Sequence, residues 1–102
     1  MDYQLVFQFP AESIDDFDRL IELEDKLITI LGSSHDVDGH DFGSKEMNIF
    51  VFTDDPEAAF IMVKDALGAD LVKNLKVAFR SVESDNYHTL WPKGASEDFS
   101  IL

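Results

Sequence analysis

The stretch Asp36-Val-Asp-Gly-His-Asp-Phe-Gly-Ser-Lys-Glu-Met-Asn-Ile-Phe-Val-Phe-Thr-Asp-Asp-Pro56 decides the fold that we predict for this chain. It joins a polar segment rich in His, Asp and Gly to an apolar run from Glu46 to Thr53 and then to a helix start. The apolar run is β-branched and aromatic and carries apolar residues on both faces, as in a strand covered on both sides. Asp55-Pro56 supplies a cap and a proline at the first helical position. The stretch therefore predicts a strand pair followed by a helix.

The residues before this stretch predict one strand and one long helix. Tyr3 to Phe9 alternates between apolar and polar side chains, which is typical of a half-buried strand, and Pro10 ends it. Ser13 is placed to cap a helix whose apolar residues recur at helical spacing as far as Leu31. Gly32 is the expected C-terminal stop.

The residues after it predict a helix, a short further turn and a last strand. The helix from Pro56 closes near Gly68, a turn covers 69–73, and 75–82 alternates again. The resulting order is β-α-β-β-α-β, the ferredoxin-like plait of the α+β class. We expect an antiparallel four-stranded sheet, in the order 4-1-3-2, with two helices on one face. Residues 1–92 form this single domain, and 93–102 form a flexible acidic C-terminal tail.

The charge of the chain is large and uneven. The net charge is −13 over 102 residues: residues 1–60 hold 15 acids and 3 bases, and residues 61–102 hold 6 acids and 5 bases. A field of this sign repels nucleic acid and anionic lipid and favours a basic partner, or it only keeps a small protein soluble. The chain has no cysteine and no long apolar run, so we expect a cytoplasmic protein that binds neither nucleic acid nor a membrane.

The polar segment and the residue that follows it on the next strand are the candidates for recognition. Its acids and histidine do not follow the pattern of a calcium loop, and a transition-metal site is not favoured, so we predict no metal. No nucleophile and base pair is legible, so we assign no catalytic residue. The candidate ligand or partner surface is Asp36, Asp38, His40, Asp41 and Asn48.

The run Lys45–Phe52 lies where an RNA-recognition domain carries its signature octamer. The positions of the stacking aromatics are occupied here by Met47 and Ile49, which together with the acidity argues against RNA. By the same analogy, we expect Phe50 and Phe52 to point toward the helices. It places an apolar association face on the open side of the sheet, made of Val6, Met47, Ile49 and Val51. A homodimer or a protein partner would cover this face; alternatively, the tail with Tyr87, Leu90 and Trp91 folds across it.

Three motifs resemble a group of small uncharacterised bacterial proteins that are ferredoxin-like and close to the ACT-type regulatory plaits. They are Asp38-Gly-His-Asp-x-Gly-Ser-x-Glu-x-Asn-Ile-Phe50, Thr53-Asp-Asp-Pro56 and Leu90-Trp-Pro92. The resemblance covers most of residues 3 to 92 and implies fold and lineage, with no known chemistry attached. In ACT-type domains effectors bind near the turn after the first strand, where this sequence has Pro10-Ala-Glu12 in place of the usual glycine.

Three functions remain open from the sequence. The leading one is a non-enzymatic protein-binding or regulatory module without a cofactor, such as an inhibitor or immunity-type protein for a basic partner. The second is an ACT-like small-ligand sensor that acts as a dimer. The third is a small enzyme built around Asp36, Asp38, His40 and Asn48, because these residues could gather between the second and third strands.

Overall fold

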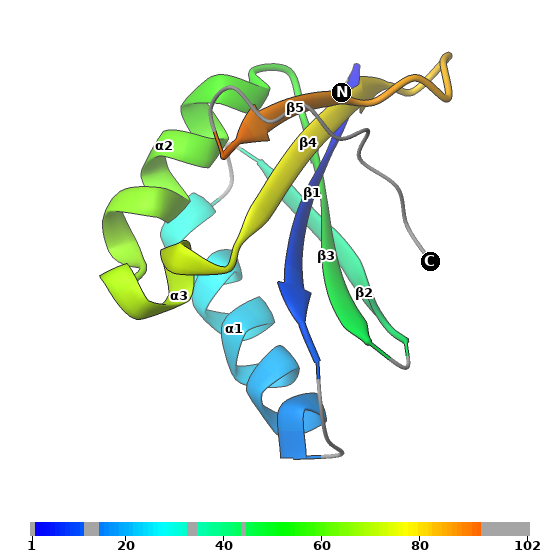
Figure 1. The fold of residues 1–102 in the computed structure, drawn as a ribbon. Coiled ribbons are helices and arrows are strands. Elements are labelled where there is room, and N and C mark those ends of the chain that lie inside the picture. The colour runs from blue at the N-terminus through cyan, green and yellow to red at the C-terminus, as the bar shows by residue number, and fades with distance from the viewer. Residues whose placement is uncertain (1, 12–14, 33–34, 44, 93–102) are drawn as a thin grey trace.

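The computed structural model describes residues 2–11, 15–32, 35–43 and 45–92, and the side chains of all of these except 15–17 and 70–71. Five strands and three helices follow one another along the chain (Figure 1). Their bounds are β1 Tyr3–Pro10, α1 Asp15–Leu31, β2 Asp36–Phe42, β3 Glu46–Thr53, α2 Pro56–Ala66, α3 Ala69–Lys73, β4 Lys76–Ser81 and β5 His88–Trp91.

The strands form one antiparallel sheet in the order β2-β3-β1-β4-β5. The α+β class is confirmed, and the order of the first four strands is the predicted one. The prediction of a four-stranded sheet is wrong, because β5 adds a fifth strand beside β4, with Phe79 opposite His88. Four residues with the polar start His88-Thr89 carry too little alternation to predict a strand, and β5 exists because β4 offers it a free edge.

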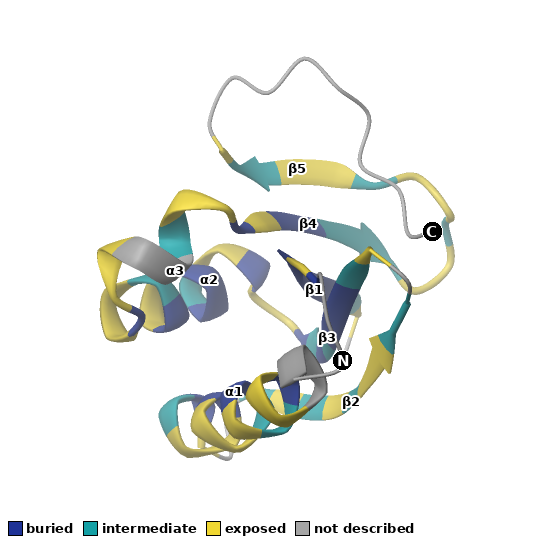
Figure 2. Ribbon diagram, turned by 60° about the horizontal axis from the view of Figure 1, so that its bottom comes forward, coloured by how far each residue is buried: buried dark blue, intermediate teal, exposed yellow. Residues whose placement is uncertain are grey.

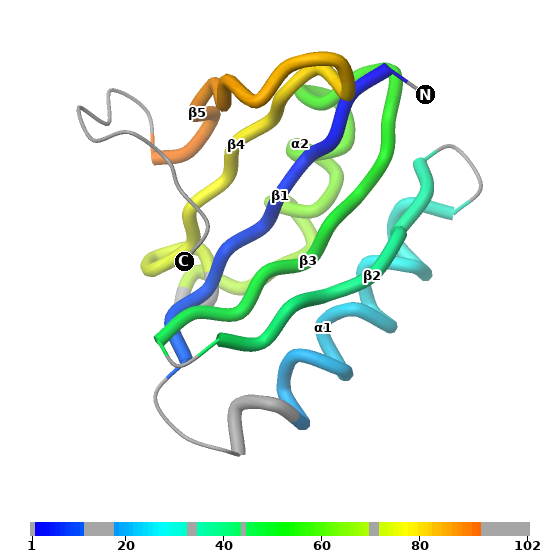
Figure 3. Tube along the Cα trace, turned by 90° about the vertical axis from the view of Figure 1, so that its right-hand side faces the viewer, coloured from blue at the N-terminus to red at the C-terminus, as the bar shows by residue number. Residues whose placement is uncertain are grey.

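Both long helices lie on one face of the sheet (Figures 1 and 3). Leu20, Leu27 and Leu31 recur at helical spacing along α1 and are buried against the strands. The helix ends as predicted: Gly32 has φ 61°, the left-handed conformation that glycine adopts without a steric penalty, and its N–H donates to the carbonyl of Ile28 at 3.1 Å. The predicted cap Ser13 lies outside the described residues.

The start of α2 also follows its sequence signature. The Asp55 carboxylate accepts a hydrogen bond from the Ala58 N–H at 3.1 Å, and Pro56 occupies the first turn. A cap of this kind satisfies an amide that the helix itself leaves without a partner. The helix stops at Ala66, and the short helix α3 occupies the predicted 69–73.

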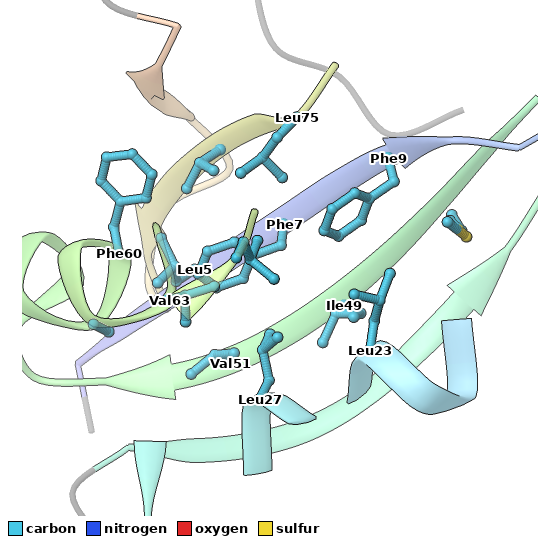
Figure 4. Packing of buried hydrophobic residues seen from close by; sticks show 14 of the residues in the cluster. Leu5, Phe7, Phe9, Leu23, Leu27, Ile49, Val51, Phe60, Val63 and Leu75 are labelled. Carbon is cyan, nitrogen blue, oxygen red and sulfur yellow. The ribbon is translucent and has the colours of Figure 1, made fainter. Parts of the chain in front are cut away.

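The prediction for the two faces of β3 is wrong. Met47, Ile49 and Val51 belong to the hydrophobic core, and Figure 4 shows Ile49 and Val51 there. Phe50 and Phe52 lie on the other face and are half-buried. The register with β1 explains the reversal: Ile49 pairs with Phe7, and residues directly opposite each other in an antiparallel pair share a face. Strand β1 supplies phenylalanines to the core, so β3 completes it with aliphatic side chains.

No helix within the described part of the chain is long and apolar enough to cross a membrane. The predicted flexible acidic tail, residues 93–102, lies outside the described residues.

Candidate functional site

Strand β2 forms one edge of the sheet, and its polar sequence is confirmed as a strand. It pairs with β3 on one side only, and no described strand lies on its other side (Figure 3). The register shifts between Val37 and Gly39, so that Asp38 has no counterpart on β3. A shift of this kind bends an edge strand and exposes the extra residue. Strand β2 is therefore an accessible edge that presents acidic side chains.

His40 lies on the helix side of the sheet. Its Nδ1 is 2.9 Å from Oε2 of Glu24 on α1, and the two side chains are 28% and 17% exposed. His40 pairs with Ile49, which faces the core, so both point toward the helix layer. The contact links the middle of α1 to the edge strand. Glu24 is thus a residue beside the candidate segment that the sequence analysis did not single out.

Asp36 and Asp41 lie on the opposite face of the sheet from His40. Asp36 pairs with Phe52 and Asp41 with Asn48, and both aspartates are exposed. The aspartates of β2 are therefore reachable from solvent, but they do not converge on the histidine. The strand presents carboxylates to the open face and at the bulge, and an imidazole to the helix side.

Asn48 is not part of the accessible surface. It is 1% exposed and accepts a hydrogen bond at its side-chain oxygen from the Gln8 side-chain amide at 3.1 Å. The two residues are directly opposite each other on β1 and β3. Asn48 therefore belongs to the sheet interior, next to Asp41 but beneath the solvent-exposed surface.

The four residues of the enzyme hypothesis are thus divided between two faces of the sheet. His40 and Asn48 point to opposite sides, and in an enzyme the base and its partner need hydrogen-bond contact or a single bridging water. Within the described residues no three histidine or acidic side chains are placed to hold a metal ion. The other histidine near the segment, His35, lies at the end of the sheet, with its Nδ1 2.6 Å from the Thr53 hydroxyl oxygen.

Helix α1 lies beside β2 (Figure 2), and both elements are rich in acidic residues. The sequence of α1 holds six acids and two bases, and β2 holds three acids without lysine or arginine. In the described part of the second half of the chain, the lysines and the arginine lie on other elements: Lys64 on α2, Lys73 on α3, and Lys76 and Arg80 on β4. We call the following residues the acidic surface: Asp18, Glu22, Glu24, Asp25, Asp36, Asp38 and Asp41.

The predicted association face changes its membership with the reversed register. Three of its four members, Met47, Ile49 and Val51, are core residues, and only Val6 lies on the face away from the helices. Val6 pairs with Phe50 on one side and with Ala78 on the other.

The chain matches no protein-family model, no curated protein and no solved structure.

Proposed function

We propose that this protein is a non-enzymatic binding module whose acidic surface takes an extended, basic segment of a partner protein along β2. The observation that carries the proposal is the position of the acids: three aspartates lie on an exposed strand that is paired on one side only. We further infer that β1 to β4 with α1 and α2 form a ferredoxin-like plait, to which β5 is added.

An edge strand offers backbone N–H and C=O groups to an incoming strand, and side chains on alternate positions select the partner. The shift at Asp38 interrupts this pattern once and leaves the Gly39–Phe42 part in regular register. A basic segment would place its cations beside Asp36 and Asp41 on one face of the sheet. The field of α1, which lies next to β2, adds to this attraction and raises the rate of encounter.

Charged side chains on an edge strand also protect a sheet against unwanted pairing with other strands, and lysine is the residue most often used for this. Here β2 carries three aspartates and neither lysine nor arginine, so the edge repels a second copy of itself and other acidic strands. It does not repel a basic strand. An acid needed only for solubility can stand anywhere on the surface, whereas these stand where a strand would add.

The proposal is tested with a fluorescein-labelled peptide of alternating lysine and valine, measured by fluorescence anisotropy at low and at moderate salt. Two peptides serve as controls: one with glutamate in place of lysine, and one with proline in place of every second valine, which keeps the charge but removes the backbone N–H donor at each of those positions. We expect binding of the first peptide only, weakened by salt because screening acts on exposed charges.

Two pairs of protein variants distinguish the effect of the charges on β2 from the effect of the net charge of the protein. Asp38→Lys with Asp41→Lys reverses two charges on β2, and Glu57→Lys with Asp65→Lys reverses two exposed charges on α2 at the same net charge. We expect the first pair to weaken binding by roughly tenfold or more, as for the loss of close charge pairs, and the second pair to weaken it far less. Equal weakening by both pairs, or equal binding of the proline peptide, would refute a β2 site.

A further inference from the structure

Helix α1 extends past the edge of the sheet that β2 forms. Figure 3 looks onto the open face of the sheet, and α1 is visible there beyond β2. The helix packs mainly against β2, and the contact between Glu24 and His40 joins the two elements. A helix with its side chains is about 10–12 Å wide and strands are about 4.8 Å apart, so one helix can cover two neighbouring strands. No described strand lies under the part of α1 that extends past β2.

The side chains of α1 become more exposed in a regular order around the helix. Successive residues of an α-helix are about 100° apart around its axis, so Glu24 lies about 60° from the core residue Leu27, and Ile28 lies about 40° further in the same direction. The exposed fraction rises in this order, from 0% for Leu27 to 17% for the Glu24 side chain and 49% for Ile28. Because Glu24 contacts His40 on β2, Ile28 faces the space beyond β2.

Ile21 lies on the same side of α1 as Ile28 and is half-buried. The two isoleucines are three and four residues from Glu24, the spacing that places side chains on one side of a helix. Helix α1 and β2 run in opposite directions along the edge (Figure 3). One turn of helix and two residues of strand each advance about 5–7 Å, so Ile28 is level with the bulge at Asp38, and Ile21 with the end of β2. We call Ile21, Glu24 and Ile28 the overhanging stripe.

We propose that the partner segment along β2 is amphipathic, with cations toward the open face of the sheet and apolar side chains packed under α1 against Ile21 and Ile28. This inference rests on the proposed β2 site and specifies the partner that the site takes. Residues opposite each other on neighbouring strands share a face. Partner residues opposite Asp36 and Asp41 therefore lie on the open face, and those opposite Val37, whose own partner Val51 is in the core, lie under the overhanging stripe.

The charges around the overhanging stripe select a basic strand over a second copy of this chain. Asp25 on α1 and Asp38 on β2 are exposed on either side of Ile28. The two bases of α1, Arg19 and Lys26, lie about 160–180° around the helix from Ile28, on its opposite side. A second β2 would bring three more aspartates to this position, and like charges repel. A strand without cations would displace water from the acids without pairing them. Alternating basic and apolar residues meet both conditions.

The test compares two fluorescein-labelled peptides of equal charge on the full chain. One is the peptide of alternating lysine and valine, and the other carries threonine in place of every valine. Threonine keeps the β-branched shape and the strand propensity of valine but is polar. Ile28→Thr makes the overhanging stripe polar, and Ile61→Thr on α2, where the isoleucine is 55% exposed, is the matched control. The readout is the Kd from fluorescence anisotropy at low salt.

We expect the valine peptide to bind about tenfold more tightly than the threonine peptide. Ile28→Thr should weaken the valine peptide by roughly fivefold and leave the threonine peptide unchanged, and Ile61→Thr should change neither. Equal Kd values for the two peptides, or equal effects of Ile28→Thr and Ile61→Thr, would overturn this inference. The β2 site itself would stand in that case if Asp38→Lys with Asp41→Lys still weakened binding. Absence of binding by both peptides would refute the site and this inference together.

A second measurement locates the apolar side chains of the bound peptide. In a complex of isotope-enriched protein with unlabelled valine peptide, we expect nuclear Overhauser effects from the valine methyl groups to the methyl groups of Ile21 and Ile28. Their absence, or effects to the Phe50 ring on the open face instead, would overturn the proposed orientation. Sedimentation of the protein alone tests the other occupant. Self-association that Ile28→Thr removes would assign the overhanging stripe to a second copy and overturn the proposal as well.

Discussion

The side-chain amide nitrogen of Gln8 lies 3.1 Å from the side-chain oxygen of Asn48, across the pair formed by β1 and β3, and both residues are almost fully buried. A polar pair in this position joins the two central strands at a fixed register, because a shift by one residue would leave each amide among apolar neighbours.

Replacing Asn48 by Ala is expected to destabilise the fold by about 1–3 kcal/mol, since it removes an acceptor from the buried Gln8 amide. Urea unfolding followed by circular dichroism measures the change. Asn86→Ala, at an exposed position, is the matched control and should leave the midpoint unchanged. A loss of similar size at both positions would show that Asn48 acts through something other than its burial.

The reversed register of β3 predicts opposite outcomes for neighbouring substitutions. Ile49→Glu should abolish folding, because it places an unpaired charge at a core position that is 0% exposed. Phe50→Glu, on the other face and half-buried, should give a folded protein of lower stability. Far-UV circular dichroism and a one-dimensional NMR spectrum distinguish the two. A folded Ile49→Glu variant would contradict the observed faces of β3.

The cap of α2 should be measurable by itself. Asp55→Ala removes the acceptor of the Ala58 N–H and should cost about 1 kcal/mol. Asp55→Asn retains a side-chain acceptor and should restore most of the loss. The comparison is made by thermal unfolding beside Asp65→Ala, which removes an exposed acid later in the same helix. If Asp65→Ala is as costly as Asp55→Ala, helix charge and not capping is the cause.

Trp91 anchors β5 to the helices. Its ring nitrogen donates to the Val72 carbonyl at 3.3 Å, its ring lies 6.0 Å from that of Phe60, and the Lys64 ammonium is 4.1 Å from its centre. We expect Trp91→Ala to cost about 2–3 kcal/mol, below the range for a fully buried tryptophan because the residue is half-buried.

The control for this anchor is Lys64→Met, which removes the cation and keeps an unbranched side chain over the ring. It should cost about 0.5–1 kcal/mol, as for a partly exposed cation–π contact. Trp91 is the single tryptophan of the chain, so its fluorescence in the Lys64 variant reports whether β5 stays in place. An unfolding loss in Lys64→Met equal to that in Trp91→Ala would argue against the indole as the anchor.

The acidic surface should respond to salt. Like charges on α1 and β2 repel one another in the folded state, and salt screens exposed charges, so the melting temperature should rise with moderate NaCl near neutral pH. Asp38→Asn with Asp41→Asn should reduce this rise, and Glu57→Gln with Asp65→Gln on α2 should reduce it less. A melting temperature that falls with salt would mean that specific ion pairs, such as His40 with Glu24, dominate.

The sequence by itself determined the local elements. Neighbouring residues suffice to predict the strands β1 and β4, the end of α1 at Gly32 and the start of α2 at Asp55-Pro56. The reason is that backbone geometry and hydrogen bonding at turns and caps depend on a few adjacent positions. The segment from Asp36 to Phe42 was expected at an edge for the same reason, since a polar segment without a core pattern is an edge strand or a loop, and it forms the edge strand β2.

Only the tertiary structure determined on which face of the sheet each side chain of β3 lies. Apolar residues stand on both parities of β3, so only pairing with Phe7 and Leu5 on β1 sends Ile49 and Val51 to the core. Residues His88–Trp91 form β5 by pairing with the free edge of β4, although their sequence shows little of the alternation typical of a strand. The contact of His40 with Glu24 joins residues sixteen positions apart that share no local pattern. Faces, added edges and long-range contacts depend on how elements pack, and packing is settled by all of them together.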